Sequence, residues 1–494
     1  MTEEQRVKRR RWSSWLPLSL VTILVLLALA AVRPNLIPEA HRFLGVHLGW
    51  LYLGSMSVFL VFALLLGFSS FGKRKLGTAN SQPEFSRVTW FAMVLSAGTS
   101  VQFVYSAVAE PLMQAAAPPF GRAGPQEGAL NAMNITLFHW SLHPWAVFTV
   151  VALCLAYASH RRELPLKFSS AFYPALGDRV HGRPGAVIDA IATLSTILIV
   201  AATLVTSAPA ITAGLEHLWH VPPGLTTQLG IVLAVSCVAT IAAASGLRNA
   251  MRRFCELNLV IIVGLLLFVL LAGQTLYLAA SFADNIWAYL SYLPSNANEL
   301  GLGANHTESR WLQRWTVPYW AWWIAWAPAV GLFIAKISKG RTIRDVVVFV
   351  LIVPALVSSA WFATLGNAAF FEQTQGQGMM SFAASGHQEA AIFELLDSLP
   401  WSQLGIVLTI MCMLLCAITS TAAASVAMAA SASKSRAQRV YGAGTAGIIA
   451  FATLCAGSAI ALWSAALAMA LPLCGLILVM CVCLLRAVRT EDRS

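Results

Sequence analysis

Long runs of apolar residues, separated by short polar segments, dominate the pattern along this chain. An α-helix needs about 20 residues to cross the hydrocarbon core of a bilayer, and the runs are close to that length. Lipid offers no partner to a free backbone group, so we predict helices, and the alternating segments of about ten residues that barrel strands require do not occur. The twelve predicted spans cover residues 15–32, 50–71, 88–109, 131–158, 187–214, 224–246, 256–282, 315–335, 346–368, 403–430, 440–463 and 466–485.

The apolar pattern is ambiguous at three places. The first run follows the basic stretch Lys8–Arg11, as in a signal sequence, but it is long enough for a membrane helix and no clear cleavage site follows, so we predict a first span. The last two runs almost merge, and we divide them at Ala465–Leu471 because Pro472 disturbs a helix. The outer segment Phe282–Arg314 contains an apolar piece, Ile286–Leu293, which we expect along the membrane surface.

Composition supports the same picture. The chain has 494 residues, of which 58% are hydrophobic and 11% are charged, whereas soluble proteins carry roughly 25% charged residues. The mean hydropathy is +0.71. These values exclude a soluble enzyme, a disordered protein and a collagen-like fibre, and they predict an all-α integral membrane protein.

The basic residues predict the orientation. If the N-terminus is cytoplasmic, the inner segments hold 27 of the 32 lysines and arginines and the outer segments hold five. This is the positive-inside pattern, and it accounts for the net charge of +11 without nucleic acid as a partner. We therefore expect a cytoplasmic tail over residues 1–14, a membrane domain over 15–485 and a second cytoplasmic tail over 486–494.

Tryptophan is the residue type that points to a ligand. Between Trp315 and Pro328, five aromatic residues fall within an arc of about 100° on one predicted helix face. A row of π faces attracts a quaternary ammonium group, which cannot donate ordinary hydrogen bonds, by about 0.5–2 kcal/mol per desolvated ring. Core packing or an interfacial aromatic belt is the competing interpretation of such a stripe. The five residues are Trp315, Tyr319, Trp322, Trp323 and Trp326.

A second aromatic group lies on the fourth predicted span. Trp140, Trp145 and Phe148 surround Pro144, which we expect to interrupt the helix, so these rings need not keep ideal helical spacing. A cation held here would be bound by indole rings in place of an acidic partner.

Ionisable residues are scarce within the predicted spans. Glu110 and Glu216 lie near outer span ends and Asp189 and Glu256 near cytoplasmic ends, so a proton-driven pump with a carboxylate at mid-membrane is not favoured.

A metal site is not favoured either. The pair His139 and His143 has i, i+4 spacing, but it lacks the glutamate of an HExxH motif and an obvious third ligand. The nine cysteines form no CxxC pair, which indicates packing residues without a disulfide framework or a zinc site.

These motifs resemble those of the betaine/choline/carnitine transporter family. The resemblance covers residues 15–485 and is strongest over 83–160 and 311–345. It is carried by Pro83–Ser86, Ala109–Leu112, His139–Trp145, Trp315–Pro328 and Gly331–Thr342.

The resemblance implies a fold that periodicity cannot supply. It implies 12 transmembrane helices with two inverted five-helix repeats of the LeuT-like kind, spans 3–7 at about 88–282 and spans 8–12 at about 315–485. Two extra N-terminal helices precede these repeats, and the assembly is a homotrimer in the plasma membrane, the inner membrane of a bacterium. It also implies transport of an onium compound of the betaine, choline or carnitine type by alternating access. The substrate-binding residues would be Trp140, Trp145, Phe148, Trp322, Trp323 and Trp326.

The chain departs from the family pattern at two places. Phe148 stands where tyrosine is usual, and Gly98 is the one glycine left in a stretch that is usually glycine-rich and unwound. Thr99, Gln102 and Tyr319 are further candidates for contact with the substrate or for the unwound stretch. Gln102 could instead bond to a neighbouring helix.

Sodium is the expected coupling ion, and no resident cofactor is expected. By the resemblance, the hydroxyls of Thr419 and Ser420 match a sodium site opposite Ser96 and Thr99, since sodium prefers oxygen ligands. A Thr-Ser pair inside a helix is more often bonded to its own backbone.

The family's sodium-independent exchangers are the first alternative. They carry an arginine at the position of Asn258 and a methionine at that of Val330, and this chain has neither. Thr99-Ser100 and the absence of an aspartate at Ala422 argue in the opposite direction.

Two other classes are less favoured. An integral-membrane enzyme would use His139, His143 and Glu110. An osmosensing transporter would need a long charged tail, which we do not expect from the C-terminal residues.

Overall fold

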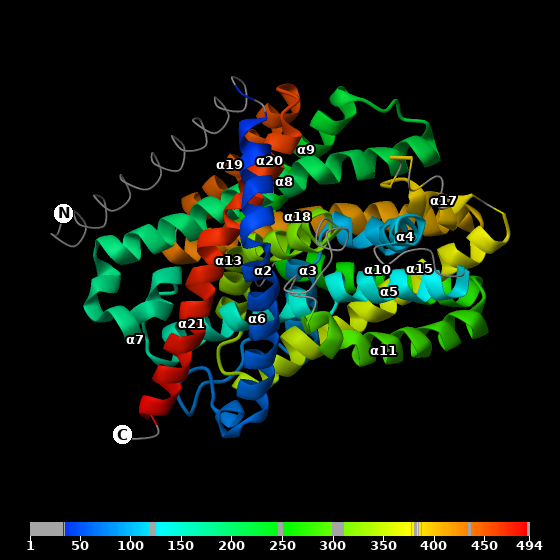
Figure 1. Cartoon of the computed structure of the whole chain (residues 1–494). Helices are drawn as coiled ribbons and strands as arrows, with labels where there is room; N and C mark the ends of the chain where they lie inside the picture. Colours follow the sequence, from blue (N-terminus) through cyan, green and yellow to red (C-terminus); the bar gives the residue numbers. More distant parts are fainter. Residues whose placement is uncertain are drawn as a thin grey trace.

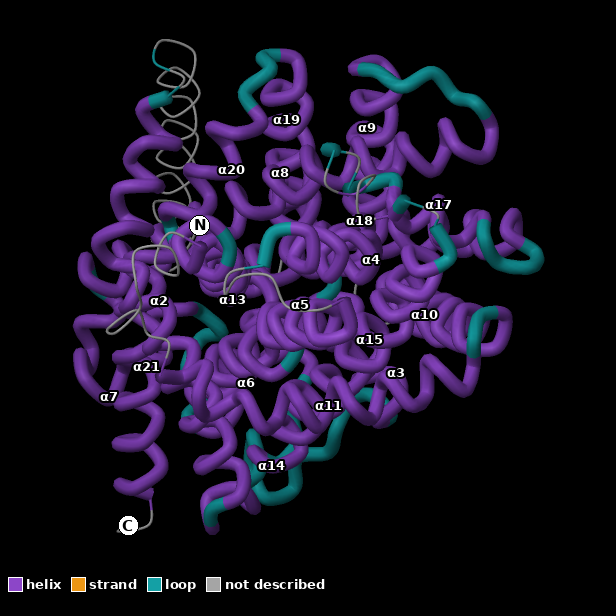
Figure 2. The backbone as a smooth tube through the Cα atoms, turned by 45° about the vertical axis from the view of Figure 1, so that its right-hand side comes forward, coloured by secondary structure: helices purple, strands orange, loops and turns teal. Residues whose placement is uncertain are grey.

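The computed structural model is mostly helical in the part of the chain that it describes, and Figure 2 shows loops joining the helices. It describes Arg33 and residues 35–118, 125–245, 250–298, 311–376, 388–432 and 436–491, with single positions between 378 and 386. The α-helices in these ranges are α2 (Leu36–Phe68), α3 (Arg87–Gly98), α4 (Val101–Ala116), α5 (Pro125–Trp140), α6 (Leu142–Ala156), α7 (Tyr173–Leu176), α8 (Arg183–Trp219), α9 (Leu225–Ser245), α10 (Arg252–Ala272), α11 (Thr275–Asn298), α13 (Thr316–Ile337), α14 (Ile343–Val346), α15 (Val353–Thr374), α17 (Ala391–Asp397), α18 (Ser402–Ala432), α19 (Arg436–Cys455), α20 (Ala459–Ala468) and α21 (Ala470–Glu491).

The prediction of an all-helical membrane protein is confirmed in its coarse form. Within the described residues, nine helical segments are long and apolar enough to cross a membrane, and a bent pair of helices makes a tenth. The first predicted span, 15–32, lies outside the described residues. The count of twelve therefore stays a prediction.

Helices α6 and α13 form the centre of the molecule (Figure 1). The most apolar stretches of Glu127–Arg161 and Trp311–Ile337 are each 94% buried. Helix α13 packs against α6, α8 and α18, whereas α2 and α21 run side by side at the edge of this group. Apolar side chains such as Leu65, Val260 and Leu271 are exposed on peripheral helices, as is expected where a surface faces lipid.

Two of the predicted spans are broken helices. Helices α3 and α4 are bent by 66° at Thr99–Ser100, and the backbone of both residues is extended. Helices α5 and α6 are separated at Ser141, so Pro144 falls in the first turn of α6, where proline is tolerated. The predicted interruption next to Pro144 is confirmed, and both breaks expose backbone groups in the interior of the bundle.

The predicted boundary between the last two spans is wrong. Helix α19 ends at Cys455, and the chain reverses at Gly457, whose φ of 62° lies in the left-handed region that favours glycine. Helices α20 and α21 then form one candidate span, Ala459–Glu491. Pro472 is tolerated in the first turn of α21, because the N–H group that it lacks would have no intrahelical partner there.

Two other limits also differ from the prediction. Helix α2 begins at Leu36, well before residue 50. The apolar piece Ile286–Leu293 is part of the longer helix α11, which packs against α5 and α15. It is buried on one side at Tyr289, which is 2% exposed, and open on the other at Trp287, which is 76% exposed.

Candidate functional site

Aromatic side chains from α5, α6 and α13 meet at the centre of the molecule. The ring of Trp140 stands edge to face against Trp322 and Trp323, with centroids 5.5 and 5.4 Å apart. Phe148 stands edge to face against Trp323 at 5.7 Å and against Trp145 at 5.9 Å. These five rings form a connected group. Together with Trp326 we call them the cage residues.

The indole N–H groups of the cage tryptophans other than Trp322 donate hydrogen bonds to the surrounding helices. Nε1 of Trp145 donates to Oγ of Ser358 at 3.1 Å, and Nε1 of Trp323 donates to the carbonyl of His139 at 3.0 Å. Trp140 donates to a carboxylate described below. An indole has only one donor, so once that edge is bound outside the group, its π face is left for a ligand.

Trp326 lies at the same site but is held differently. Its N–H group donates to the carbonyl of Ala97 at 3.4 Å, at the C-terminal end of α3. No ring contact of Trp326 occurs among the described residues. Trp322 differs again, because its buried N–H group has no hydrogen-bond partner in the part of the chain that the structure describes.

The absence of a side chain at Gly98 allows the cage to approach the helix break. A Cβ atom on Gly98 would lie 2.5 Å from Cη2 of Trp145, which is far inside van der Waals contact. It would also lie 3.5 Å from Cε2 of Phe148. Gly98 is therefore a position where α3 approaches the cage closely, because no other residue fits without moving Trp145.

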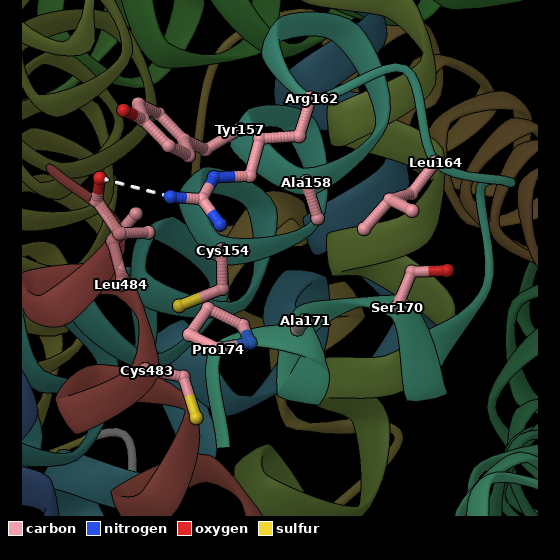
Figure 3. Close-up of a pocket in the computed structure, with 11 residues that line it drawn as sticks. Cys154, Tyr157, Ala158, Arg162, Leu164, Ser170, Ala171, Pro174, Cys483 and Leu484 are labelled. Carbon is pink, nitrogen blue, oxygen red and sulfur yellow. Dashed lines mark hydrogen bonds between the residues drawn. The ribbon is translucent and has the colours of Figure 1, made fainter. Parts of the chain in front are cut away.

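The cage is shielded from solvent. Each of its six side chains is at most 4% exposed. The cavity drawn in Figure 3 lies elsewhere, between α6, the turn Phe168–Phe172 and α21, where Cys154 and Cys483 line it. Its volume of about 10 Å³ suits one water molecule. A trimethylammonium group could therefore enter between the cage rings only after neighbouring helices had moved.

Sequence reasoning missed several residues that support the cage. Phe362 on α15 stacks on Trp140 at 4.9 Å, and Phe103 on α4 contacts both of these rings. Trp463 on α20 lies 6.0 Å from Trp322. Single aromatic residues in apolar spans carry no spacing signal, so the sequence offered nothing that set these three apart.

A buried carboxylate lies directly against the cage, a neighbour that the sequence did not reveal. Glu110 is 2% exposed. Its Oε2 accepts hydrogen bonds from Trp140 Nε1 and, at 2.6 Å, from the hydroxyl of Tyr319. Its Oε1 lies 2.6 Å from Nδ1 of His139. The bend at Thr99–Ser100 turns α4 toward α5 and α13, and position along the sequence does not reveal this.

The two histidines of the fourth span have different surroundings. His139 stacks on Tyr319 with centroids 4.4 Å apart, and its Nε2 lies 3.0 Å from Oγ1 of Thr316. His143 faces Phe138 and Trp320 instead. Within the described ranges, no three histidine, cysteine, aspartate or glutamate side chains are grouped as metal ligands would be.

The four hydroxyl residues predicted for sodium are all buried beside the same helix break. Oγ1 of Thr419 on α18 lies 3.2 Å from the carbonyl of Ser96 on α3, as well as 2.7 Å from a carbonyl of its own helix. Ser420 and Thr99 bond to their own helices, and Thr99 also faces Cys416 at 3.8 Å. The structure thus brings Thr419 and Ser96 into contact, while no hydrogen bond joins Ser420 to α3 among the described residues.

Two candidates remain, Tyr319 and Gln102. Tyr319 is fixed by Glu110, as described above. Gln102 is in the first turn of α4, and its Oε1 is buried without a hydrogen-bond partner in the described part of the chain.

Comparison with known proteins identifies the relatives of this chain. The model of the betaine/carnitine/choline family of transporters matches residues 12–493. The glycine betaine transporter of Acinetobacter baylyi is 33% identical over 483 residues, which are 96% of this chain and 73% of that protein. Glycine betaine transporter OpuD of Bacillus subtilis is 36% identical over 388 residues, 78% of this chain and 75% of that protein. Glycine betaine transporter 1 of Vibrio parahaemolyticus is 34% identical over 454 residues, 90% of this chain and 86% of that protein.

Proposed function

The chain belongs to the betaine/carnitine/choline transporter family, and on that premise we propose that it carries an onium compound of the betaine, choline or carnitine type across the membrane as a secondary transporter. The cage is the observation that carries this proposal. Five aromatic rings linked by pairwise contacts, three of them with their N–H groups bonded to the surrounding helices, present π faces to a positively charged methylated nitrogen. Three relatives named as glycine betaine transporters support the same substrate class.

Alternating access is the transport mechanism that fits this site. The cage residues are buried, so a substrate can reach them only when surrounding helices separate. The breaks at Thr99–Ser100 and Ser141 supply points where helices can pivot, and both adjoin the cage. Broken helices beside a central site are the arrangement that transporters with inverted repeats use.

The proposal extends to the architecture and setting implied by the family. We propose twelve spans, with repeats over about 88–282 and 315–485 after two extra helices, assembled as a homotrimer. We also propose a bacterial inner membrane with both termini in the cytoplasm, supported by the 27 basic residues in alternate segments.

Sodium is the coupling ion that we propose. Thr419 brings a hydroxyl to the carbonyl of Ser96 at the end of α3, and both are neutral oxygen ligands of the type that sodium binds. Asn258 adds a polar side chain there, since its Nδ2 lies 3.3 Å from Oγ of Ser96. A sodium-independent exchanger is the alternative. An arginine at position 258 would place a fixed cation there, and asparagine does not.

Uptake into proteoliposomes tests the proposal directly. Radiolabelled glycine betaine, choline and carnitine are offered with and without an inward sodium gradient. Sodium-stimulated uptake of at least one compound is expected. Uptake only into vesicles preloaded with an onium compound would favour the exchanger, and no uptake or competition by any methylammonium compound would contradict the assignment.

The same preparation addresses the enzyme alternative. Glu110 and His139 are in contact, so a metal-dependent enzyme would have two of its candidate groups together. Metal analysis of the purified protein separates the two classes, and we expect no stoichiometric transition metal.

A further inference from the structure

The Glu110 carboxylate joins α4 to two of the helices that build the cage. It lies on α4, it accepts from Trp140 and His139 at the end of α5, and it accepts from Tyr319 on α13. His139 extends the connection, because its carbonyl accepts the N–H group of Trp323 at 3.0 Å. One cage tryptophan, Trp140, is therefore held directly by this acidic residue, and a second, Trp323, bonds to the backbone of its partner His139.

The hydrogen bonds around Glu110 match an ionised carboxylate. An ionised carboxylate only accepts hydrogen bonds, and three donors point at its two oxygens. Nδ1 of His139 faces Glu110 at 2.6 Å, and Nε2 of the same ring lies 3.0 Å from Oγ1 of Thr316. No lysine or arginine within the described ranges forms an ion pair with Glu110. The carboxylate is thus held next to the rings by the donors of Trp140, Tyr319 and His139.

We infer that Glu110 is a positioning residue that orients Trp140 and Tyr319 and supplies the negative field which makes the cage prefer a cation to an uncharged group of the same shape. This inference rests on the proposed function. A carboxylate that accepts the N–H of Trp140 fixes the ring, and its charge acts through a dry, apolar site where electrostatic interactions are weakly screened. No lysine or arginine among the described residues faces Glu110, and the onium nitrogen would bring a fixed positive charge near it.

A purely structural role for Glu110 predicts a different result. If the carboxylate only holds the rings in place, its loss weakens every ligand of the cage by the same factor. If its charge contributes, its loss weakens a cationic ligand and spares one that lacks the charge. The ratio between two such ligands therefore separates the two roles.

The experiment uses glycine betaine and 3,3-dimethylbutanoate, in which a carbon replaces the charged nitrogen. Both are measured on the purified full-length protein by displacement of radiolabelled glycine betaine. Glu110→Gln keeps the shape and removes the charge, and Glu110→Asp keeps the charge. Glu256→Gln is the matched control, because that glutamate lies at the end of α10, bonded to Thr89 and Arg252 and away from the cage.

We expect Glu110→Gln to bind glycine betaine on the order of tenfold more weakly, while the affinity for 3,3-dimethylbutanoate stays within twofold or improves. Glu110→Asp should recover at least part of the betaine affinity, and Glu256→Gln should leave it unchanged. Equal losses for both ligands, or no loss for either, would overturn the inference. The concentrations of 3,3-dimethylbutanoate extend high enough for its affinity to be measured in every variant, and the ratio between the two ligands decides the question.

The outcome also separates this inference from the proposed function. A wild-type protein that binds no onium compound contradicts the proposed function itself. A wild-type protein that binds betaine, with Glu110→Gln unchanged, contradicts the inference alone. If Glu110→Gln does not purify as a folded protein, Tyr319→Phe replaces it, since it removes one of the three donors and keeps the ring. About threefold weaker betaine binding by that variant would support the inference, and unchanged binding would overturn it.

Discussion

The break between α3 and α4 has two sides with different chemistry. On one side, Trp145 packs on Gly98 and Trp326 donates to the carbonyl of Ala97. On the other side, the hydroxyl of Thr419 approaches the carbonyl of Ser96. The backbone of residues 96–98 borders both sides, and only the side chains that face it differ. Large π faces suit a bulky, weakly hydrated cation, whereas hydroxyl and carbonyl oxygens suit a small, hard one.

This contrast indicates how one helix break can link two ligands. Under the proposed function, sodium on the oxygen side and an onium group on the aromatic side would both contact the last turn of α3. Movement of that turn would then change the geometry of both sites, without a separate connecting element. The predictions below change one side at a time, in order of decreasing expected effect.

Filling the close approach at Gly98 should have the largest effect. In Gly98→Ala the new Cβ would collide with Trp145, and overpacking of this kind costs about 1–3 kcal/mol. We expect onium affinity, measured by displacement of labelled betaine, to fall roughly tenfold or more. Gly264→Ala is the matched control, because a Cβ there meets nothing within 4 Å. Equal behaviour of the two variants would show that α3 does not shape the cage.

Removing one cage ring should have the next largest effect. Trp323→Ala should weaken onium binding by about 1–2 kcal/mol, since one desolvated cation–π contact is lost. Trp323→Phe keeps a π face and should lose less. Trp287 on α11 is 76% exposed, so Trp287→Ala provides the comparison. Unchanged affinity in Trp323→Ala would count against its role, and quenching of intrinsic tryptophan fluorescence by ligand offers a convenient measurement.

Removing a hydroxyl on the side of Thr419 and Ser96 should change the sodium dependence of uptake and leave the affinity of the cage for betaine unchanged. Thr419→Val removes the hydroxyl near Ser96, and we expect the half-saturating sodium concentration for uptake to rise about fivefold. Betaine affinity at saturating sodium should stay within twofold. Thr409→Val is the control, because that hydroxyl is buried on the same helix and, among the described residues, bonds to the carbonyl of Gly405 of its own helix. Sodium-independent uptake in the wild type would remove the basis of this prediction and favour the exchanger.

Adding a hydroxyl to the cage should have the smallest effect. Phe148→Tyr keeps the π face and introduces one polar atom at a residue that is fully buried. We expect betaine affinity to change less than threefold, measured beside the wild type in the same displacement assay. A loss as large as that of Trp323→Ala would mean that packing, and not the π face, determines binding at this position.

The sequence predicted those features that periodicity and motif carry. The apolar runs located most of the helices, Pro144 located the break before α6, and the aromatic stripe located Trp322 and Trp323. Helix limits that depend on single residues escaped prediction, because hydropathy does not change across Gly457, where α19 ends.

The position of Glu110 could not be predicted for a different reason. Its place in the sequence puts it near the end of a straight span, and only the bend at Thr99–Ser100 brings it against Trp140. Likewise, Phe362 and Trp463 reach the cage from α15 and α20 through tertiary packing, which a single sequence does not encode in its spacing.

A ligand-bound density map of this protein with glycine betaine tests the central claim most directly. The account predicts the trimethylammonium group within about 6 Å of the ring centroids of Trp145, Phe148 and Trp323. Density for the ligand at another place, with those three rings still in contact with one another, would contradict it.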